Sequence, residues 1–304
     1  MQSIPRIDIS NNTNGAEVLD ALKNYGFFYI TGHGIENAKI KEMMKISETF
    51  FNKGAAFKLN FDYVGKTNSG YLPPDKELLN VNTKADPKEA YNLRKFNGKV
   101  SFSHPPELEV RFVQEFAHET QIVALNVLQK LAIGLGIDPK YFATRHVFED
   151  ESGDILRLLN YPPTVDPSII LAGGHSDYGS LTLLFQDEIG GLEVFHNNGW
   201  VPIPPIEGAI VVNAGDLMSF WTCGLIKSAI HRVVGNSTNR SRKSIAYFLH
   251  PTGDTSLDPI PSTKIANVNN KMHERHSIEF TGTIKKSLTA NEHLMQRLKD
   301  SRLD

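Results

Sequence analysis

The sequence predicts an α+β fold, with a helix-rich front half and a strand-rich back half packed into one unit. Apolar residues recur at helical spacing before residue 150, whereas after Asp154 they recur at every second position. No flexible linker divides the two halves. Many short strands at close spacing are typical of a β-sandwich or barrel, and a double-sheet jelly roll is one such arrangement.

Residues 1–105 form an N-terminal region in which we expect two short strands and two helices. The strands are residues 4–9 and 26–30, and the helices cover residues 16–24 and 39–51, where apolar side chains follow helical spacing. From residue 54 to residue 106 the sequence is rich in Asn, Gly, Pro and Lys. Long irregular stretches in a compact protein are usually functional, so we interpret this one as loops that cover a site.

Residues 106–150 contain the longest predicted helix, over residues 106–137. Its apolar residues from Val113 to Leu135 follow three- and four-residue steps, and Pro106 and Gly136 mark its ends. Such a stripe is typical of a helix that packs one face on a core. We therefore interpret this helix as scaffold.

Residues 151–255 carry the strand-rich core, and residues 256–304 form a C-terminal segment with a helix near residues 291–303. The alternation predicts seven short strands separated by Pro, Gly, Asn or Asp. These strands cover residues 155–159, 181–185, 191–195, 209–212, 217–221, 230–234 and 244–249. We expect the four regions to form a single unit over residues 1–304.

The composition excludes several kinds of partner. The chain has 32 Lys and Arg residues against 34 Asp and Glu residues, which argues against nucleic acid and against an anionic membrane as partners. The sequence also lacks a membrane-spanning apolar stretch and the pattern of a secretory signal. The one cysteine, Cys223, can form no disulfide within the chain, so we expect a cytoplasmic setting, with the nucleus as an alternative. The expected partner is a small molecule, and the oligomeric state stays open.

His175, Asp177 and His231 indicate a metal site. In an extended backbone, His175 and Asp177 leave the same face, which is the spacing that two metal ligands need. About one His-x-acid pair is expected by chance, but His231 adds to the signal because it lies in an apolar strand, where a buried histidine needs a partner. Two histidines and a carboxylate form the facial triad that suits non-haem Fe(II), whereas a core histidine bonded to a backbone carbonyl is the structural alternative.

A candidate site for a dicarboxylate follows at Arg242 and Ser244, which open another predicted strand. The two side chains share a face and offer a cationic fork and a hydroxyl donor. A guanidinium near an iron site can fix the distal carboxylate of a dicarboxylate through paired, charge-assisted hydrogen bonds. An Arg-x-Ser pair is common by itself, and its place after the three candidate ligands makes it specific.

In this combination the motifs resemble the iron(II)- and 2-oxoglutarate-dependent dioxygenases of the isopenicillin N synthase-like superfamily. Residues 160–163, and residues 4–8 and 25–35 in the N-terminal half, extend the resemblance over nearly the whole chain. It implies a single catalytic unit with a distorted double-stranded β-helix (jelly-roll) core and flanking helices. Several core segments are most similar to microbial and fungal members, among them the thymine-methyl hydroxylases, but this iron-site framework does not select a substrate.

The resemblance also implies roles for individual residues. The three candidate ligands would bind iron, and the Arg-x-Ser pair would bind the distal carboxylate of 2-oxoglutarate. Tyr161 matches a tyrosine that contacts this co-substrate, whereas Leu159 stands where plant members often have an asparagine. For the substrate wall we consider five side chains, for which core packing is the alternative: Tyr71, Arg94, Phe102, Phe220 and Trp221.

The implied reaction couples oxidative decarboxylation of 2-oxoglutarate, giving succinate and CO2, to hydroxylation or desaturation of a small-molecule substrate. It requires Fe(II), 2-oxoglutarate and dioxygen, with ascorbate as a candidate reductant. Two alternatives stay open at this point. One is an iron oxidase of the same fold that does not use 2-oxoglutarate, and the other is a non-catalytic ligand-binding relative.

Overall fold

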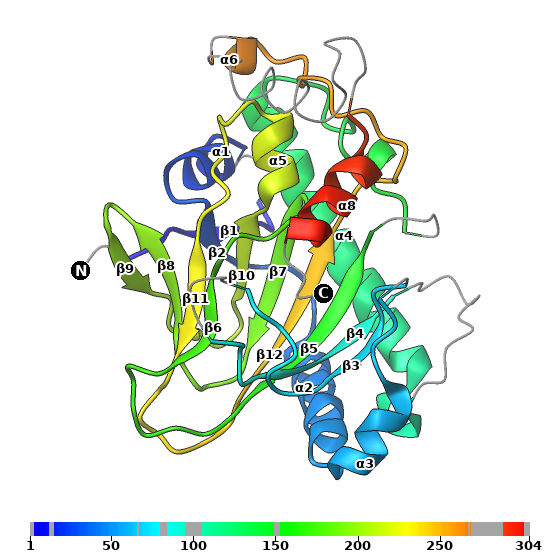
Figure 1. Cartoon of the computed structure of the whole chain (residues 1–304). Helices are drawn as coiled ribbons and strands as arrows, with labels where there is room; N and C mark the ends of the chain where they lie inside the picture. Colours follow the sequence, from blue (N-terminus) through cyan, green and yellow to red (C-terminus); the bar gives the residue numbers. More distant parts are fainter. Residues whose placement is uncertain are drawn as a thin grey trace.

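The computed structural model describes residues 3–11, 15–65, 67–79, 84–94, 105–148, 153–266, 268 and 288–300, and Figure 1 shows two sheets with helices packed around them. The helices are α1 (Gly15–Asn24), α2 (Asn37–Phe51), α3 (Ala55–Lys58), α4 (Val110–Leu135), α5 (Asp216–Trp221), α6 (Thr263–Ala266) and α8 (Ala290–Asp300). Short 3-10 turns cover Leu59–Phe61, Pro106–Leu108 and Ala143–Arg145. None of the described helices is long and apolar enough to cross a membrane.

The larger sheet has the strand order β1-β2-β10-β7-β12-β5-β4-β3, and the smaller sheet has the order β6-β11-β8-β9. The strands of the larger sheet are β1 (Arg6–Asp8), β2 (Phe27–Thr31), β3 (Gly70–Leu72), β4 (Glu89–Leu93), β5 (Ile155–Tyr161), β7 (Leu181–Gln186), β10 (Ile210–Ala214) and β12 (Arg242–Leu249). Those of the smaller sheet are β6 (Ile170–His175), β8 (Leu192–His196), β9 (Gly199–Pro202) and β11 (His231–Val234). Apolar side chains from both sheets form one buried cluster between them, which is the packing of a jelly-roll sandwich.

Strand pairing brings together motifs that lie far apart in the sequence. In the smaller sheet, His231 of β11 is the register partner of His175 at the end of β6. In the larger sheet, β12 lies between β5 and β7, so that Arg242 faces Tyr161 and Ser244 is paired with Gln186. The jelly roll therefore places both motifs on strands that enclose the same interior.

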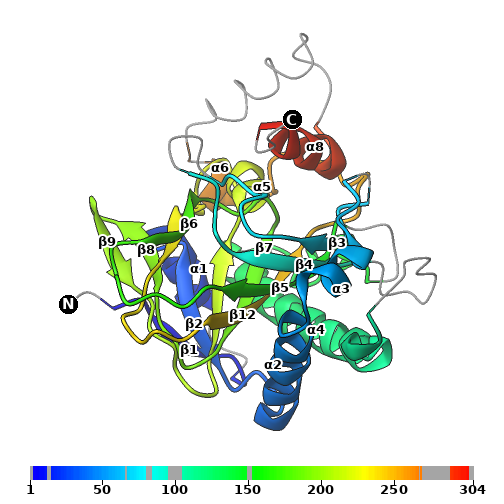
Figure 2. The same cartoon turned by 60° about the horizontal axis from the view of Figure 1, so that its bottom comes forward.

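A second and larger core lies on the other side of the larger sheet, where Figure 2 shows α2 and α4 packed beneath the strands. Phe116 of α4 packs on Phe185 of β7, with ring centroids 5.0 Å apart. Helix α1 crosses α4 at two glycines, because a Cβ atom on Gly134 would lie 2.2 Å from the carbonyl oxygen of Gly15. The apolar stripe of the long helix thus packs on this core, as its spacing predicts.

The observed elements differ from the predicted ones in several places, since strands β6 and β9 and the short helices α3 and α6 were not predicted. The segment predicted as a strand at residues 217–221 is helix α5, and all five of its side chains are buried. A segment that is apolar on every side has no readable period, so periodicity cannot separate a buried strand from a buried turn of helix. The stretch predicted as loops contains the edge strand β3 and strand β4, which lies between β3 and β5.

Candidate active site

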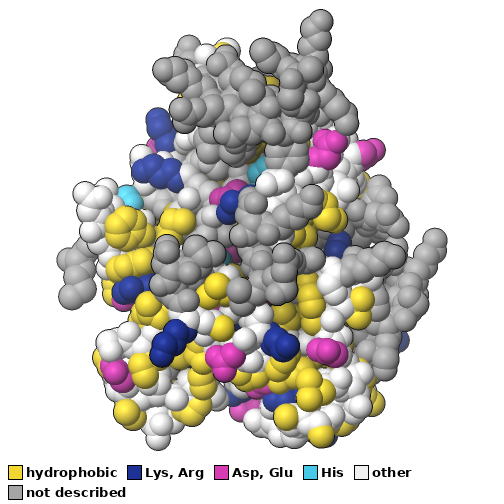
Figure 3. All heavy atoms as spheres, in the orientation of Figure 1, with side chains coloured by type: hydrophobic (Ala, Val, Ile, Leu, Met, Phe, Trp, Pro, Cys, Tyr) yellow, Lys and Arg dark blue, Asp and Glu magenta, His cyan; other side chains and the backbone are white. Residues whose placement is uncertain are grey.

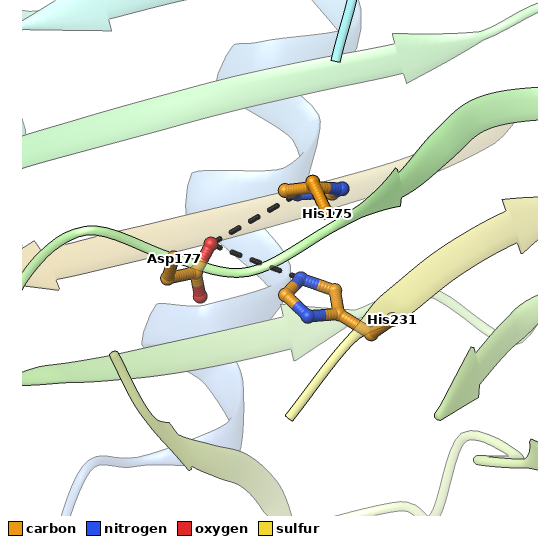
Figure 4. A group of neighbouring side chains, drawn as sticks. All are labelled: His175, Asp177 and His231. Atoms are coloured by element: carbon orange, nitrogen blue, oxygen red, sulfur yellow. Dashed lines mark ion pairs between the residues drawn. The ribbon is translucent and has the colours of Figure 1, made fainter. Parts of the chain in front are cut away.

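Three side chains meet where strand β6 ends and strand β11 begins, as Figure 4 shows. Asp177 Oδ1 lies 3.9 Å from Nε2 of His175 and 3.7 Å from Nε2 of His231. One ligand atom from each residue lies within 4.8 Å of the others, a spacing that a single metal ion can span. Two imidazole nitrogens and one carboxylate oxygen are the donor set of a facial triad, and this set fits Fe(II).

Hydrogen bonds to the backbone fix the orientation of both imidazole rings. His175 Nδ1 lies 2.8 Å from the carbonyl oxygen of Gly173, and His231 Nδ1 lies 3.2 Å from that of Ala229. Because a carbonyl oxygen only accepts, each Nδ1 carries a proton and donates it, so in the neutral form of the ring the lone pair lies on Nε2. Both Nε2 atoms therefore face Asp177 in the form that binds a metal.

The carboxylate is held just as firmly through its second oxygen. Asp177 Oδ2 accepts hydrogen bonds from Thr182 Oγ1 at 2.5 Å and from Asn213 Nδ2 at 2.7 Å. Burial favours the neutral acid, but the neighbouring His231 and His175 and these two donors outweigh it, so the pKa of Asp177 lies below its ordinary value. The result is an ionised carboxylate with Oδ1 directed at the two histidines.

The imidazole of His175 is neutral at physiological pH. Burial, followed by the proximity of His231, lowers the pKa of His175 to about 3. A neutral imidazole is the form that binds a metal, so at neutral pH no proton has to leave this ring before a metal can bind.

Arg242 lies deeper in the sandwich and is almost fully buried, with 1% of its surface exposed. One terminal nitrogen donates to Ser244 Oγ at 3.2 Å and the other donates to Gln186 Oε1 at 2.9 Å. The guanidinium also lies 4.9 Å from the ring centroid of Tyr161. None of the described hydrogen bonds involves Nε of Arg242, and its described hydrogen-bond partners are both uncharged. A buried guanidinium of this kind fits an anionic ligand.

Two adjoining cavities lead outward from this cation. On the face that Figure 3 shows, Lys, Arg, Asp and Glu side chains lie among hydrophobic ones over the described residues. The inner cavity joins the three candidate ligands to Arg242, Ser244 and Tyr161. The outer cavity, of about 370 Å³, begins at His175 and Asp177 and opens between the loop before β4 and helix α8. The walls shared by both cavities are Arg157, His175, Asp177 and Phe248. A co-substrate in the inner cavity and a substrate in the outer one would thus meet beside the same three ligands.

The structure brings together the six residues that the motifs indicated, but it does not bring to them the four described residues among the five considered for the substrate wall. Tyr71 lies in the core instead, where its hydroxyl donates to Glu89, because it points away from the cavity face of β3. Phe220 and Trp221 are also core residues, on the buried helix α5. Arg94 lines a neighbouring cavity that shares His250, Leu294 and other residues with the outer one. Phe102 lies outside the described residues.

Several residues of the outer cavity gave no signal in the sequence. Asn92 and Arg157 are register partners on β4 and β5, and both line this cavity together with Tyr178 and Phe248. Two of them lie close in the sequence to a residue of a motif. Tyr178 comes directly after Asp177, and Phe248 is on the same face of β12 as Ser244. The period-two rule could have suggested Phe248, whereas nothing local marks Asn92.

Comparison with known proteins agrees with this geometry. A family model described as the 2OG-Fe(II) oxygenase superfamily matches residues 152–251, and one described as the N-terminal region of a non-haem dioxygenase in morphine synthesis matches residues 4–109. UPF0676 protein C1494.01 of Schizosaccharomyces pombe is 35% identical over 275 residues, which cover 84% of each chain. Gibberellin 20 oxidase 3 of Arabidopsis thaliana is 33% identical over 300 residues, which cover 91% of this chain and 77% of the relative.

A solved structure extends the similarity to three dimensions. A full-length protein of Neurospora crassa, crystallised in complex with alpha-KG and thymine, superposes with a TM-score of 0.81 at 29% identity and covers 98% of this chain and 96% of that one. These relatives favour the use of 2-oxoglutarate over the two alternatives considered from the sequence. The chain belongs to the 2OG-Fe(II) oxygenase superfamily, and it is an Fe(II)- and 2-oxoglutarate-dependent oxygenase that oxidises a small molecule.

Proposed function

We propose that His175, Asp177 and His231 hold the iron of this oxygenase, and that Arg242 and Ser244 bind the distal carboxylate of 2-oxoglutarate. The observation that carries the proposal is the single interior that joins these five side chains. The two Nε2 atoms and Oδ1 converge on one point, while the buried guanidinium lies at the other end of the inner cavity. A dicarboxylate that chelates the metal with one end can therefore reach a cation with the other.

When iron and 2-oxoglutarate are bound, they supply the oxidising chemistry: dioxygen is reduced, one of its atoms enters succinate as CO2 leaves, and the other enters a C–H bond of the substrate. The protein positions the reactants. Tyr161 packs on the guanidinium of Arg242 and keeps it directed along the inner cavity. Thr182 and Asn213 keep Asp177 ionised, so that the site carries a negative charge to balance a divalent cation.

For the substrate we propose a planar, uncharged ring with a C=O and N–H edge, as in a pyrimidine. Asn92 is 3% exposed and its side-chain oxygen accepts no hydrogen bond from the described residues. The Nε of Arg157, on the neighbouring strand, likewise donates none to them. A buried acceptor beside a buried donor matches a ring edge that offers one donor and one acceptor. Tyr178 and Phe248 supply aromatic walls for the faces of such a ring.

The charges in the cavity wall favour a neutral substrate over an anion. Arg157 is already paired with Glu77, whose carboxylate also lies 3.1 Å from the Lys88 ammonium. Lys88 in turn pairs with Asp86 at 2.6 Å. Two cations and two carboxylates thus compensate one another before any substrate enters, so an added anion would find no net positive charge. The thymine held by the Neurospora crassa relative has this neutral, planar chemistry.

The experiment that tests this proposal supplies the purified chain with Fe(II), 2-oxoglutarate, dioxygen and thymine. We expect oxidised thymine that is heavier by one oxygen atom, with one succinate formed per product molecule. Uracil lacks the ring methyl group and is the matched control, which should give no such product. Succinate without oxidised thymine would reject the substrate class, whereas no succinate under any condition would reject the assigned site.

We also propose the cytoplasm as the location of this enzyme. The one cysteine of the chain, Cys223, is buried and unpaired, and an Fe(II) enzyme needs a reducing compartment. Fluorescence from a tagged full-length chain would test the location, and a signal confined to a secretory compartment would contradict it.

A further inference from the structure

Helix α8 forms part of the wall of the outer cavity, which His175 and Asp177 also line. Figure 1 shows α8 beside α5, near the end of β12. Leu294 and Leu298 lie one turn apart on α8, and both line the outer cavity together with His175, Asp177 and Tyr178. A substrate next to the ligand loop would therefore also contact this helix.

The first turn of α8 is fixed to the protein by backbone contacts. The N–H of Ala290 donates to the carbonyl oxygen of Thr255, and the N–H of Asn291 donates to that of Gly253, both at 2.9 Å. One turn later, the ring of His293 packs on Phe220 of α5, with centroids 5.8 Å apart. These contacts fix the end of the helix that lies away from Leu298.

Arg297 makes a contact that holds the cavity-lining turn of α8. Its guanidinium donates to Asp216 Oδ2 at 2.7 Å and lies 5.2 Å from the ring centroid of Tyr178. Asp216 is in turn bound to the loop of the candidate ligands, because its Oδ2 accepts from Ser176 Oγ at 3.0 Å and its N–H donates to the carbonyl oxygen of Asp177 at 2.7 Å. Arg297 thus links the helix, the aromatic wall and the ligand loop.

We infer that Arg297 is a positioning residue that closes the substrate cavity, by docking α8 on Asp216 and by holding the Tyr178 ring against the substrate. This inference rests on the proposed site. The pair is partly exposed, with 35% of the Arg297 side chain and 20% of the Asp216 side chain accessible. Such a pair adds little to global stability, so its loss should change where α8 and Tyr178 lie and leave the rest of the fold intact.

The test compares Arg297→Gln with wild type in two measurements. With thymine as the substrate, we expect KM for thymine to rise about three- to five-fold and product formed per succinate to fall, while KM for 2-oxoglutarate stays unchanged. Hydrogen exchange of a peptide that covers α8 should become faster by a similar factor, and this readout needs no substrate. Arg297→Lys keeps the charge and should restore most of both properties.

The matched control is Arg111→Gln, which removes an exposed pair with Glu115 within α4, lines neither cavity and should change neither measurement. Unchanged exchange in Arg297→Gln would overturn the docking role. Faster exchange with unchanged KM and unchanged coupling would overturn the positioning role. If wild type forms succinate but does not oxidise thymine, the proposed substrate is wrong. Hydrogen exchange of the α8 peptide, together with succinate formation, then still decides whether Arg297 docks the helix. If wild type forms no succinate, the proposed function itself fails.

Discussion

The two sides of the active site are built differently. On the side of the candidate metal ligands, short-range backbone contacts and strand pairing fix each group, as in the bond from His175 to the carbonyl of Gly173. On the substrate side, the wall consists of a loop, strands β4 and β5 and helix α8, and ion pairs between distant segments, such as that of Glu77 with Arg157, join its parts. The rigid side is suited to chemistry that is common to a family, and the assembled side can change its specificity without disturbing that chemistry.

The largest effect is expected on the rigid side. His175→Ala removes one of three metal ligands, so we expect bound iron and succinate formation to fall to background. His196→Ala is a matched control, because His196 stacks on Tyr25 away from the cavity and should leave both readings unchanged. Circular dichroism would show that the fold persists. Full iron content in His175→Ala would show that His175 does not bind the iron.

A smaller but still large effect is expected at the other end of the inner cavity. Arg242→Met removes the buried cation and its charge-assisted hydrogen bonds, so KM for 2-oxoglutarate should rise by about 10- to 100-fold. Iron affinity in the absence of 2-oxoglutarate should change little, since the described hydrogen bonds of Arg242 go to Ser244 and Gln186 rather than to a candidate ligand. Equilibrium binding of iron and steady-state kinetics separate the two quantities. An unchanged KM would refute the role of Arg242.

On the assembled side we expect a change in specificity with the oxidising chemistry intact. Asn92→Ala removes the buried acceptor, so KM for thymine should rise by about ten-fold while succinate formation without substrate stays the same. Asn60→Ala is the matched control, because this exposed amide bonds to nearby backbone carbonyls of its own turn. If both variants retain the wild-type KM, Asn92 does not contact the ring.

The smallest effect on catalysis is expected in the scaffold behind both sides. Gly134→Ala places a Cβ atom against the backbone of Gly15, so we expect a loss of about 1–3 kcal/mol in the free energy of unfolding with unchanged kinetic constants for the folded enzyme. Gly54→Ala has no atom within 4 Å of the new methyl group and should be nearly neutral. Urea denaturation measures both variants. Equal stability would show that the α1–α4 crossing can widen without cost.

The difference between the metal-ligand side and the substrate side of the site also explains which residues the sequence could predict. The spacing of His175 and Asp177 indicates a shared face, and strand pairing brings His231 to the same point as the register partner of His175. The substrate wall could not be found in this way. Tyr71 and Trp221 are aromatic residues that were considered for this wall, but periodicity does not say which face of an element is covered by core, and both lie in the core.

Arg157 and Asn92 depend on the pairing of two strands, and one of these strands, β4, was predicted as loop. A short strand that mixes polar and apolar residues carries little periodic signal, so its register becomes visible only in the assembled sheet. Helix α8 was expected near its observed position, but its contact with the ligand loop arises from the tertiary structure.

The central claim is that one interior holds both iron and 2-oxoglutarate, and the ratio of succinate formed to dioxygen consumed tests it most directly. For the wild-type chain with Fe(II), we predict one succinate per dioxygen, with no turnover in His175→Ala and a much higher 2-oxoglutarate requirement in Arg242→Met. Dioxygen consumption by the wild-type chain that is independent of 2-oxoglutarate and yields no succinate would contradict the account.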